Sequence, residues 1–173
     1  MHYLYDLFYH EMATHKLDLG DFDEIDYYLI AIHTSLEDYR LAYYINQRLP
    51  INLSKSKDEV QISVKEGETN FSRFYYYDNE NAVSWNLIQN KSEVLQLNQG
   101  STQNLFSNIS MEISTKVYLL PEFKKADYFL KIDNTQDCMN ALNIKKHLTE
   151  IESVSTVYSV DTNKIKSKNN LIF

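Results

Sequence analysis

Two segments of the chain carry apolar residues at helical spacing. In residues 36–49 apolar positions recur every fourth residue, and Pro50 follows, which lacks the amide donor that another helical turn would need. This apolar stripe consists of Leu41, Ile45 and Leu49. A second stripe, in residues 140–151, consists of Ala141, Ile144, Leu148 and Ile151. We therefore predict two amphipathic helices, each buried along one side.

A helix-start pattern precedes the first of these segments. Thr34 stands three residues before Glu37, and Ser35 stands three residues before Asp38. In such a capping box, the hydroxyl accepts a hydrogen bond from a backbone amide of the first helical turn. The spacing predicts that one of these two pairs caps the helix.

Aromatic and β-branched residues are concentrated in short segments around the two helices, as is typical of strands. The predicted strands are residues 15–19, 26–33, 51–53, 60–64, 71–77, 83–89, 113–120, 126–132 and 154–160. Residues 78–81 predict a hairpin turn between two of them. Within residues 83–89, one face would carry Val83, Trp85 and Leu87, and the other Ser84, Asn86 and Ile88. Residues 91–110, rich in Gln, Asn and Ser, predict a flexible loop.

Each predicted helix lies between predicted strands, with further hairpin strands between the two units. This order predicts an α+β fold with a single mixed, largely antiparallel sheet and two helices packed on one of its faces. A ferredoxin-like arrangement with inserted strands is the first choice of topology. Residues 1–11 resemble an N-terminal extension, because Met12 offers a second start. The expected organisation is therefore an extension at 1–11 and one α+β domain at 12–173.

Composition limits the chemistry of the chain. It has 173 residues, a formal net charge of −7, three glycines and one cysteine, Cys138. So few glycines leave little room for a glycine-rich phosphate loop, and one cysteine excludes a disulfide framework and points to the cytoplasm. No run of 18 apolar residues predicts a membrane span. The acidic balance disfavours nucleic-acid backbones, and no cofactor or metal is expected.

A signature-like stretch lies at residues 120–128, LPEFKKADY. It resembles the motif of the IPExxxVDY family of bacterial proteins, with Leu120 in place of Ile and Ala126 in place of Val. Residues 30–46, 85–87 and 158–173 also look like that family. The family has no assigned reaction, so the resemblance implies a cytoplasmic single domain and nothing about mechanism. The motif residues of interest are Leu120, Pro121, Glu122, Asp127 and Tyr128.

Candidate chemistry is sparse, and each candidate has a structural alternative. His33, Thr34 and Ser35 stand where a strand meets a helix N-terminus and could hold an anion, although Glu37 and Asp38 oppose it. The alternative is a packed structural histidine. No two of the histidines share zinc-ligand spacing, and Cys138 and His147 would fall on opposite faces of one helix.

Two carboxylates and one aromatic run complete the candidates. Glu122 and Asp127 could divide acid and base roles, or they could bond amides around the Pro121 bend, which we favour. Arg73 with Tyr75, Tyr76 and Tyr77 could form a base-stacking surface, but an aromatic core face is favoured over it. The more attractive functional reading of the same residues is a protein interface.

The leading functional prediction is a non-catalytic binding or assembly module that acts through protein–protein or small-ligand contacts, with a protein partner or a second copy as homodimer. One alternative is a small-molecule enzyme using His33 with Glu122 or Asp127. The other is an RNA-associated factor using Arg73 and the C-terminal lysines, Lys164, Lys166 and Lys168.

Overall fold

The computed structural model describes residues 27–65, 67–98, 111–134 and 141–173. The helices are α1 (Asp38–Arg48) and α2 (Ala141–Thr149), with short 3-10 turns at Pro121–Phe123, Thr162–Lys164 and Lys168–Leu171. The strands are β1 (Tyr27–Thr34), β2 (Ser54–Lys55), β3 (Val60–Val64), β4 (Gly67–Phe71), β5 (Arg73–Asp78), β6 (Val83–Gln89), β7 (Lys91–Asn98), β8 (Met111–Tyr118), β9 (Tyr128–Asp133) and β10 (Val154–Ser159).

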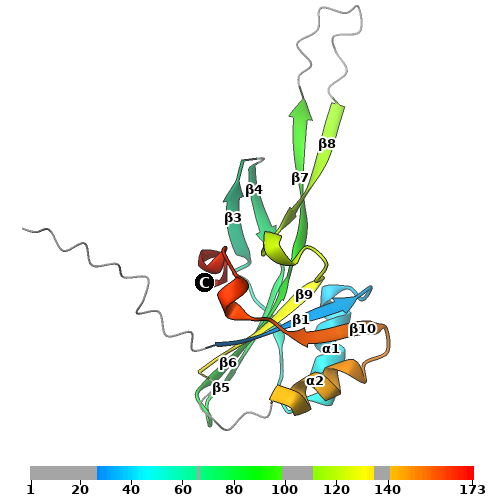
Figure 1. The fold of residues 1–173 in the computed structure, drawn as a ribbon, viewed down its shortest axis with the longest axis vertical. Coiled ribbons are helices and arrows are strands. Elements are labelled where there is room, and N and C mark those ends of the chain that lie inside the picture. The colour runs from blue at the N-terminus through cyan, green and yellow to red at the C-terminus, as the bar shows by residue number, and fades with distance from the viewer. Residues whose placement is uncertain (1–26, 66, 99–110, 135–140) are drawn as a thin grey trace, which may run out of the picture.

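Within these described residues, six strands form one sheet in the order β10–β1–β9–β6–β5–β2, and β3–β4 and β7–β8 form two separate hairpins. Every pairing among them is antiparallel. Both hairpins extend away from one end of the sheet (Figure 1). The α+β class and the largely antiparallel sheet are therefore confirmed, whereas the ferredoxin-like topology stays a prediction.

Side chains from alternate positions of the strands form two separate cores, one on each face of the sheet. On the face that we call the helix face, Ile30, Ile32, Leu87 and Leu130 pack with residues of α1 and α2. On the opposite face, which we call the tail face, Leu29, Ala31, Ile88 and Phe129 pack with residues that include Leu119, Ile165 and Leu171. The predicted alternation in β6 is confirmed, because Trp85 and Leu87 lie in the first core and Ile88 in the second.

Both helices form where the apolar stripes predict them and pack on the same face of the sheet. The predicted capping boxes are wrong. Glu37 is the N-cap residue of α1, and no side chain caps the helix there. The Thr34 hydroxyl instead accepts a bond from the Leu36 amide (3.1 Å) and donates to the Ser153 carbonyl (2.8 Å), because the chain bends one turn before the helix begins.

The loop predicted for residues 91–110 is wrong over its first part. Residues 91–98 form β7, which pairs along its whole length with β8. Backbone pairing with β8 and contact with β4 hold this strand in place. Because its stability does not depend on an alternation of apolar side chains, the sequence pattern did not predict it. Residues 51–53 are not a strand, although Ile51 and Leu53 are buried. The predictions for residues 1–26, including the strand at 15–19, and for residues 99–110 lie outside the described part of the chain.

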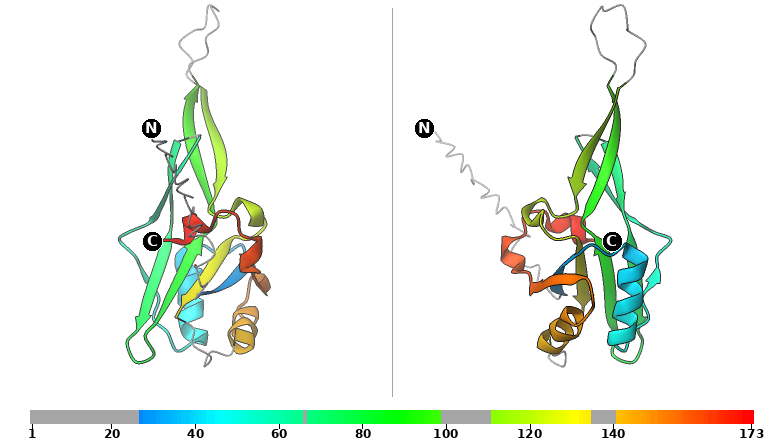
Figure 2. Two further views of the ribbon diagram at one scale, coloured as in Figure 1. Left: turned by 60° about the vertical axis from the view of Figure 1, so that its left-hand side comes forward. Right: turned by 90° about the vertical axis from the view of Figure 1, so that its right-hand side faces the viewer.

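The C-terminal segment, residues 160–173, which we call the tail, lies beside the base of the hairpins (Figure 2). Its Ile165 and Leu171 are buried in the tail-face core. The tail face is therefore covered by irregular chain and hairpin roots, whereas the helix face is covered by two helices.

Candidate functional site

His33, Asp127 and Lys91 meet where three strands approach one another. Asp127 directly precedes β9, and its amide donates to the Ile32 carbonyl (3.0 Å), which brings its carboxylate to the end of β1. There, Oδ1 lies 2.5 Å from Lys91 Nζ, and Oδ2 lies 3.8 Å from His33 Nδ1. The ring of Tyr158 stacks on His33 at 5.8 Å between centroids. The cluster therefore joins β1, β7, β9 and β10.

The amide predicted to hold an anion at the start of the α1 region already has an anionic partner. Thr34 N donates to Asp127 Oδ2 at 3.0 Å, so a carboxylate of the protein itself occupies this donor. Ser35 is exposed, and His33 is half-buried against Tyr158. This geometry favours a structural role for His33 over a shared anion site with Thr34 and Ser35.

Glu122 connects the signature stretch to the tail. Its carboxylate accepts bonds from the amides of Lys166 and Ser167, both at 2.9 Å, and from the Ser167 hydroxyl at 2.8 Å. Burial alone would raise the pKa of Glu122, but the bonds from its own backbone amide, the Ser167 hydroxyl and the two tail amides outweigh burial and lower that pKa. Glu122 is thus a structural anion whose donors include its own amide in the Pro121 turn and the distant tail residues Lys166 and Ser167.

The remaining signature residues are also engaged in packing. Leu120 is fully buried, and Pro121 begins a 3-10 turn. The Tyr128 hydroxyl donates to the Leu36 carbonyl at 2.9 Å, and burial, together with the nearby charges of Asp38, Asp127 and Glu37, raises the pKa of Tyr128 to about 12.

Asn90, which the sequence analysis did not single out, holds the signature stretch in place. Its fully buried side chain donates to the carbonyls of Phe123 and Ala126 and accepts from the Leu120 amide, each at 2.9 Å. The backbone of Asn90 also bonds to Asp127 and Leu119. No local sequence signal marks this residue, because an asparagine between two strands reads as an ordinary turn residue.

Arg73 and the tyrosines of β5 do not form one continuous surface. Tyr76 packs against the helix-face core, Tyr75 is half-buried, and Tyr77 is 42% exposed. The Arg73 guanidinium lies over the rings of Phe173 (4.4 Å) and Tyr75 (5.2 Å), and Arg73 Nε donates to Asn86 Oδ1 (2.9 Å). Both the cation and most of the aromatic run are thus used inside the fold.

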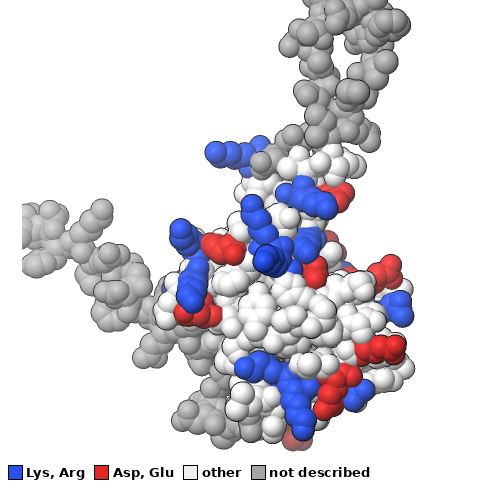
Figure 3. Space-filling model, turned by 45° about the vertical axis from the view of Figure 1, so that its right-hand side comes forward, with Lys and Arg blue, Asp and Glu red and all other residues white. Residues whose placement is uncertain are grey.

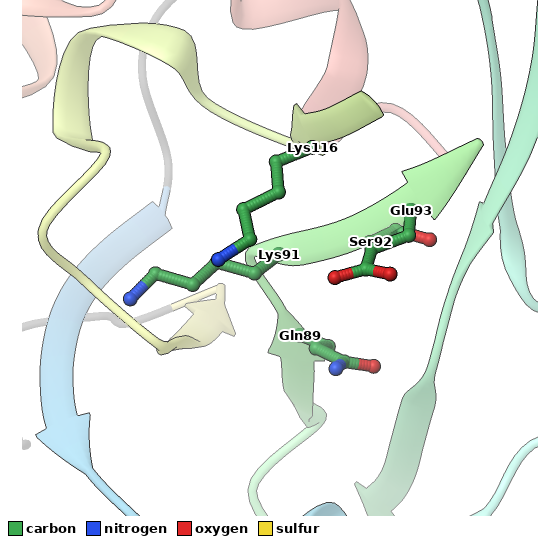
Figure 4. Close-up of a pocket in the computed structure, with 5 residues that line it drawn as sticks. All are labelled: Gln89, Lys91, Ser92, Glu93 and Lys116. Carbon is green, nitrogen blue, oxygen red and sulfur yellow. The ribbon is translucent and has the colours of Figure 1, made fainter. Parts of the chain in front are cut away.

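An open pocket of about 450 Å³ lies at the base of the β7–β8 hairpin, beside the His33 cluster. It is lined by Gln89, Lys91, Ser92, Glu93 and Lys116 (Figure 4). Lys and Arg side chains gather around the hairpin base on the face drawn in Figure 3. Among the residues that the structure describes, no three His, Cys, Asp or Glu side chains are placed to hold a metal ion.

Comparisons with family models, with curated proteins and with solved structures found no match to this chain. Neither α1 nor α2 has the length and hydropathy needed to cross a bilayer. The class that the fold defines is therefore an α+β domain with an antiparallel sheet, and its function has to be inferred from its own surfaces.

Proposed function

We propose that this chain is a non-catalytic assembly module that forms a homodimer by pairing strand β10 with the same strand of a second copy. The observation that carries the proposal is the outer edge of β10, which no described strand covers. None of the six residues of β10 (VSTVYS) is charged, and none is proline or glycine. An exposed edge with this composition is a template for further strand pairing.

The backbone of β10 supplies the groups that such pairing needs. Val160 N donates to the Leu29 carbonyl at 2.8 Å, and the same register pairs Tyr158 with Ala31. Because hydrogen-bonded and open positions alternate along an antiparallel ladder, Val157 and Ser159 direct their backbone groups away from β1. A two-fold axis beside Tyr158 would pair Val157 of each copy with Ser159 of the other.

The opposite edge of the sheet is protected over part of its length, where β2 pairs with Phe74 and Tyr75 of β5. Strand β2 is two residues long and contains Lys55, and the charged residues Lys57, Asp58 and Glu59 follow it. Short strands and edge lysines are features that prevent edge-to-edge pairing. Pairing of β10 with β10 uses the open edge of each copy, and the β2 edge is less suited to pairing. The contrast between the two edges therefore supports a closed dimer rather than a fibre.

Two observations support assembly over the enzyme and RNA alternatives. The Glu122 carboxylate is bound by tail amides and does not pair with His33. The Asp127 carboxylate lies 3.8 Å from His33 Nδ1, but it is also held by Lys91 and by the Thr34 amide, which favours a structural role over acid–base chemistry. Arg73 is covered by two rings, which removes the cation that a base-stacking surface would use.

Light scattering coupled to size-exclusion chromatography over a concentration series tests this proposal. The wild-type chain is expected to run as a dimer. Thr156→Lys places a charge on an exposed position of β10 and should weaken the dimer at least about tenfold, since edge lysines oppose strand pairing. Ser54→Lys, the same change on exposed β2, is the matched control and should leave the dimer intact.

Three results would overturn the proposal: a monomer at every concentration, a dimer that Thr156→Lys leaves unchanged, or equal dissociation by Ser54→Lys. Circular dichroism of both variants tests whether the fold is retained, so that loss of the dimer can be distinguished from unfolding.

We also propose, from the signature stretch at residues 120–128, that the chain belongs to the IPExxxVDY family and acts in the cytoplasm. The support is that Glu122 and Asp127 of this stretch both make long-range structural contacts, as expected of residues that define a fold. Detection of the native protein in cell fractions tests the location, and recovery in a membrane or secreted fraction would contradict it.

A further inference from the structure

We propose that the pocket at the base of the β7–β8 hairpin binds a small molecule that carries an oxyanion, a phosphate or a carboxylate group. This inference concerns a different surface from β10 and does not depend on self-association. Its volume of about 450 Å³ lies within the range of small-molecule sites, roughly 300–1,000 Å³.

The hairpin register places two lysines on one side of the pocket. Lys91 pairs with Tyr118, and Glu93 with Lys116, so Lys91 and Lys116 are diagonal neighbours on the same face of the hairpin. Figure 4 shows the two lysine side chains running in the same direction, with Gln89 at the other end of the pocket. Two ammonium groups thus lie on the same side of the pocket, away from Gln89.

The two lysines differ in what neutralises them. Lys91 is paired with Asp127 at 2.5 Å. Glu93, directly opposite Lys116, accepts a bond from the Ser114 hydroxyl at 2.8 Å and forms no ion pair with Lys116. In the described part of the chain, no carboxylate lies within ion-pair distance of the Lys116 ammonium, and the side-chain amide of Gln89 has no hydrogen-bond partner.

These unpaired donors define the ligand chemistry. A lysine ammonium binds phosphate or carboxylate oxygens as a point charge, and an amide NH₂ group adds a directed donor to another oxygen. Asp127 neutralises Lys91 and holds it in place, so Lys91 is not the main ligand contact. Lys116 is the residue expected to contact the anion directly.

Isothermal titration of the full chain with pyrophosphate and, in a second arm, with citrate tests the proposal and distinguishes the two sources of the oxyanion. Binding of at least one probe is expected, weakening as salt rises because the pocket is open to solvent. Lys116→Gln should reduce the affinity at least about tenfold, as loss of a charge-assisted contact does. Lys57→Gln, an equal charge change on an exposed turn, should leave the affinity within twofold.

Absence of binding by both probes would overturn the inference. So would unchanged affinity in Lys116→Gln, or an equal loss in Lys57→Gln, which would indicate a general charge effect. The titration is repeated with the Thr156→Lys variant, which should be monomeric. Its affinity for the probe should equal that of the wild type, so the ligand inference is tested independently of the dimer proposal.

Discussion

The two faces of the central sheet are covered in different ways. On the helix face, α1 and α2 press apolar side chains such as Ile45 and Leu148 onto the strands. On the tail face, irregular segments are held by specific hydrogen bonds. The side chains of Asn90 and Asn170 donate to backbone carbonyls, and the Glu122 carboxylate accepts from tail amides. A helix satisfies most of its own backbone groups, whereas irregular chain needs side chains to do so.

This difference predicts where each face is vulnerable. The helix face should respond mainly to changes of side-chain volume, because packing supplies its stability. The tail face should respond mainly to loss of hydrogen-bonding groups, because their buried backbone partners would be left unsatisfied. Substitutions at four positions test this contrast, in order from the largest expected effect to the smallest.

Asn90→Ala is expected to have the largest effect, a loss of roughly 4 kcal/mol in the free energy of unfolding. The change leaves the Phe123 and Ala126 carbonyls and the Leu120 amide without partners in a fully buried place, and each unsatisfied group costs about 1–3 kcal/mol. Urea denaturation measures the loss, with the exposed Asn52→Ala as control. A loss under about 1 kcal/mol would show that the tail face does not depend on these bonds.

Ile45→Ala is expected to cost about 3 kcal/mol by opening a cavity under α1, since Ile45 is fully buried. Ile45→Val, which removes one methylene group, should cost about 1 kcal/mol. The same denaturation experiment measures both. Equal losses in the two variants would show that the stability of the helix face does not depend on the volume of the buried side chain.

The contrast between the faces also explains which parts of the fold the sequence could predict. The stripes of α1 and α2 and the alternation in β6 follow from burial of apolar side chains, which leaves a period in the sequence. Strand β7 has no such period: Lys91, Ser92 and Glu93 are polar, and pairing with β8 decides their conformation. Tertiary pairing of this kind overrides local composition.

The candidate site was predictable only in part. His33 and Asp127 were named from the sequence, and they do lie 3.8 Å apart between their nearest charged atoms. Lys91, which pairs with Asp127, and Lys116, which lines the pocket, were not identified as site residues, because their meeting depends on the register of β7 with β8. Glu122 accepts hydrogen bonds from amides that lie 44 and 45 residues away, beyond any local pattern.

Glu122→Gln is expected to cost about 2 kcal/mol at pH 7, the size expected of hydrogen bonds to a charged group. The folded-state pKa of Glu122 is lowered, so its contribution to stability is present above the ordinary pKa of 4.5 and is lost as the pH falls through the folded-state value. The difference between wild type and variant should therefore shrink below pH 4.5. Denaturation between pH 3 and 7 measures it, and a gap that stayed constant with pH would contradict the role of the carboxylate.

Phe173→Ala is expected to have the smallest effect, about 0.5–1 kcal/mol, because the Phe173 ring is partly exposed and its contacts with the Arg73 and Lys131 cations are of the cation–π kind. The neighbouring Ile172 is 78% exposed, so Ile172→Ala should leave the stability unchanged and serves as the control. Equal, negligible losses in both variants would mean that the end of the tail adds nothing to the tail face. A measurable loss in Phe173→Ala alone would instead extend the dependence on specific polar contacts from Asn90 to the last residue of the chain.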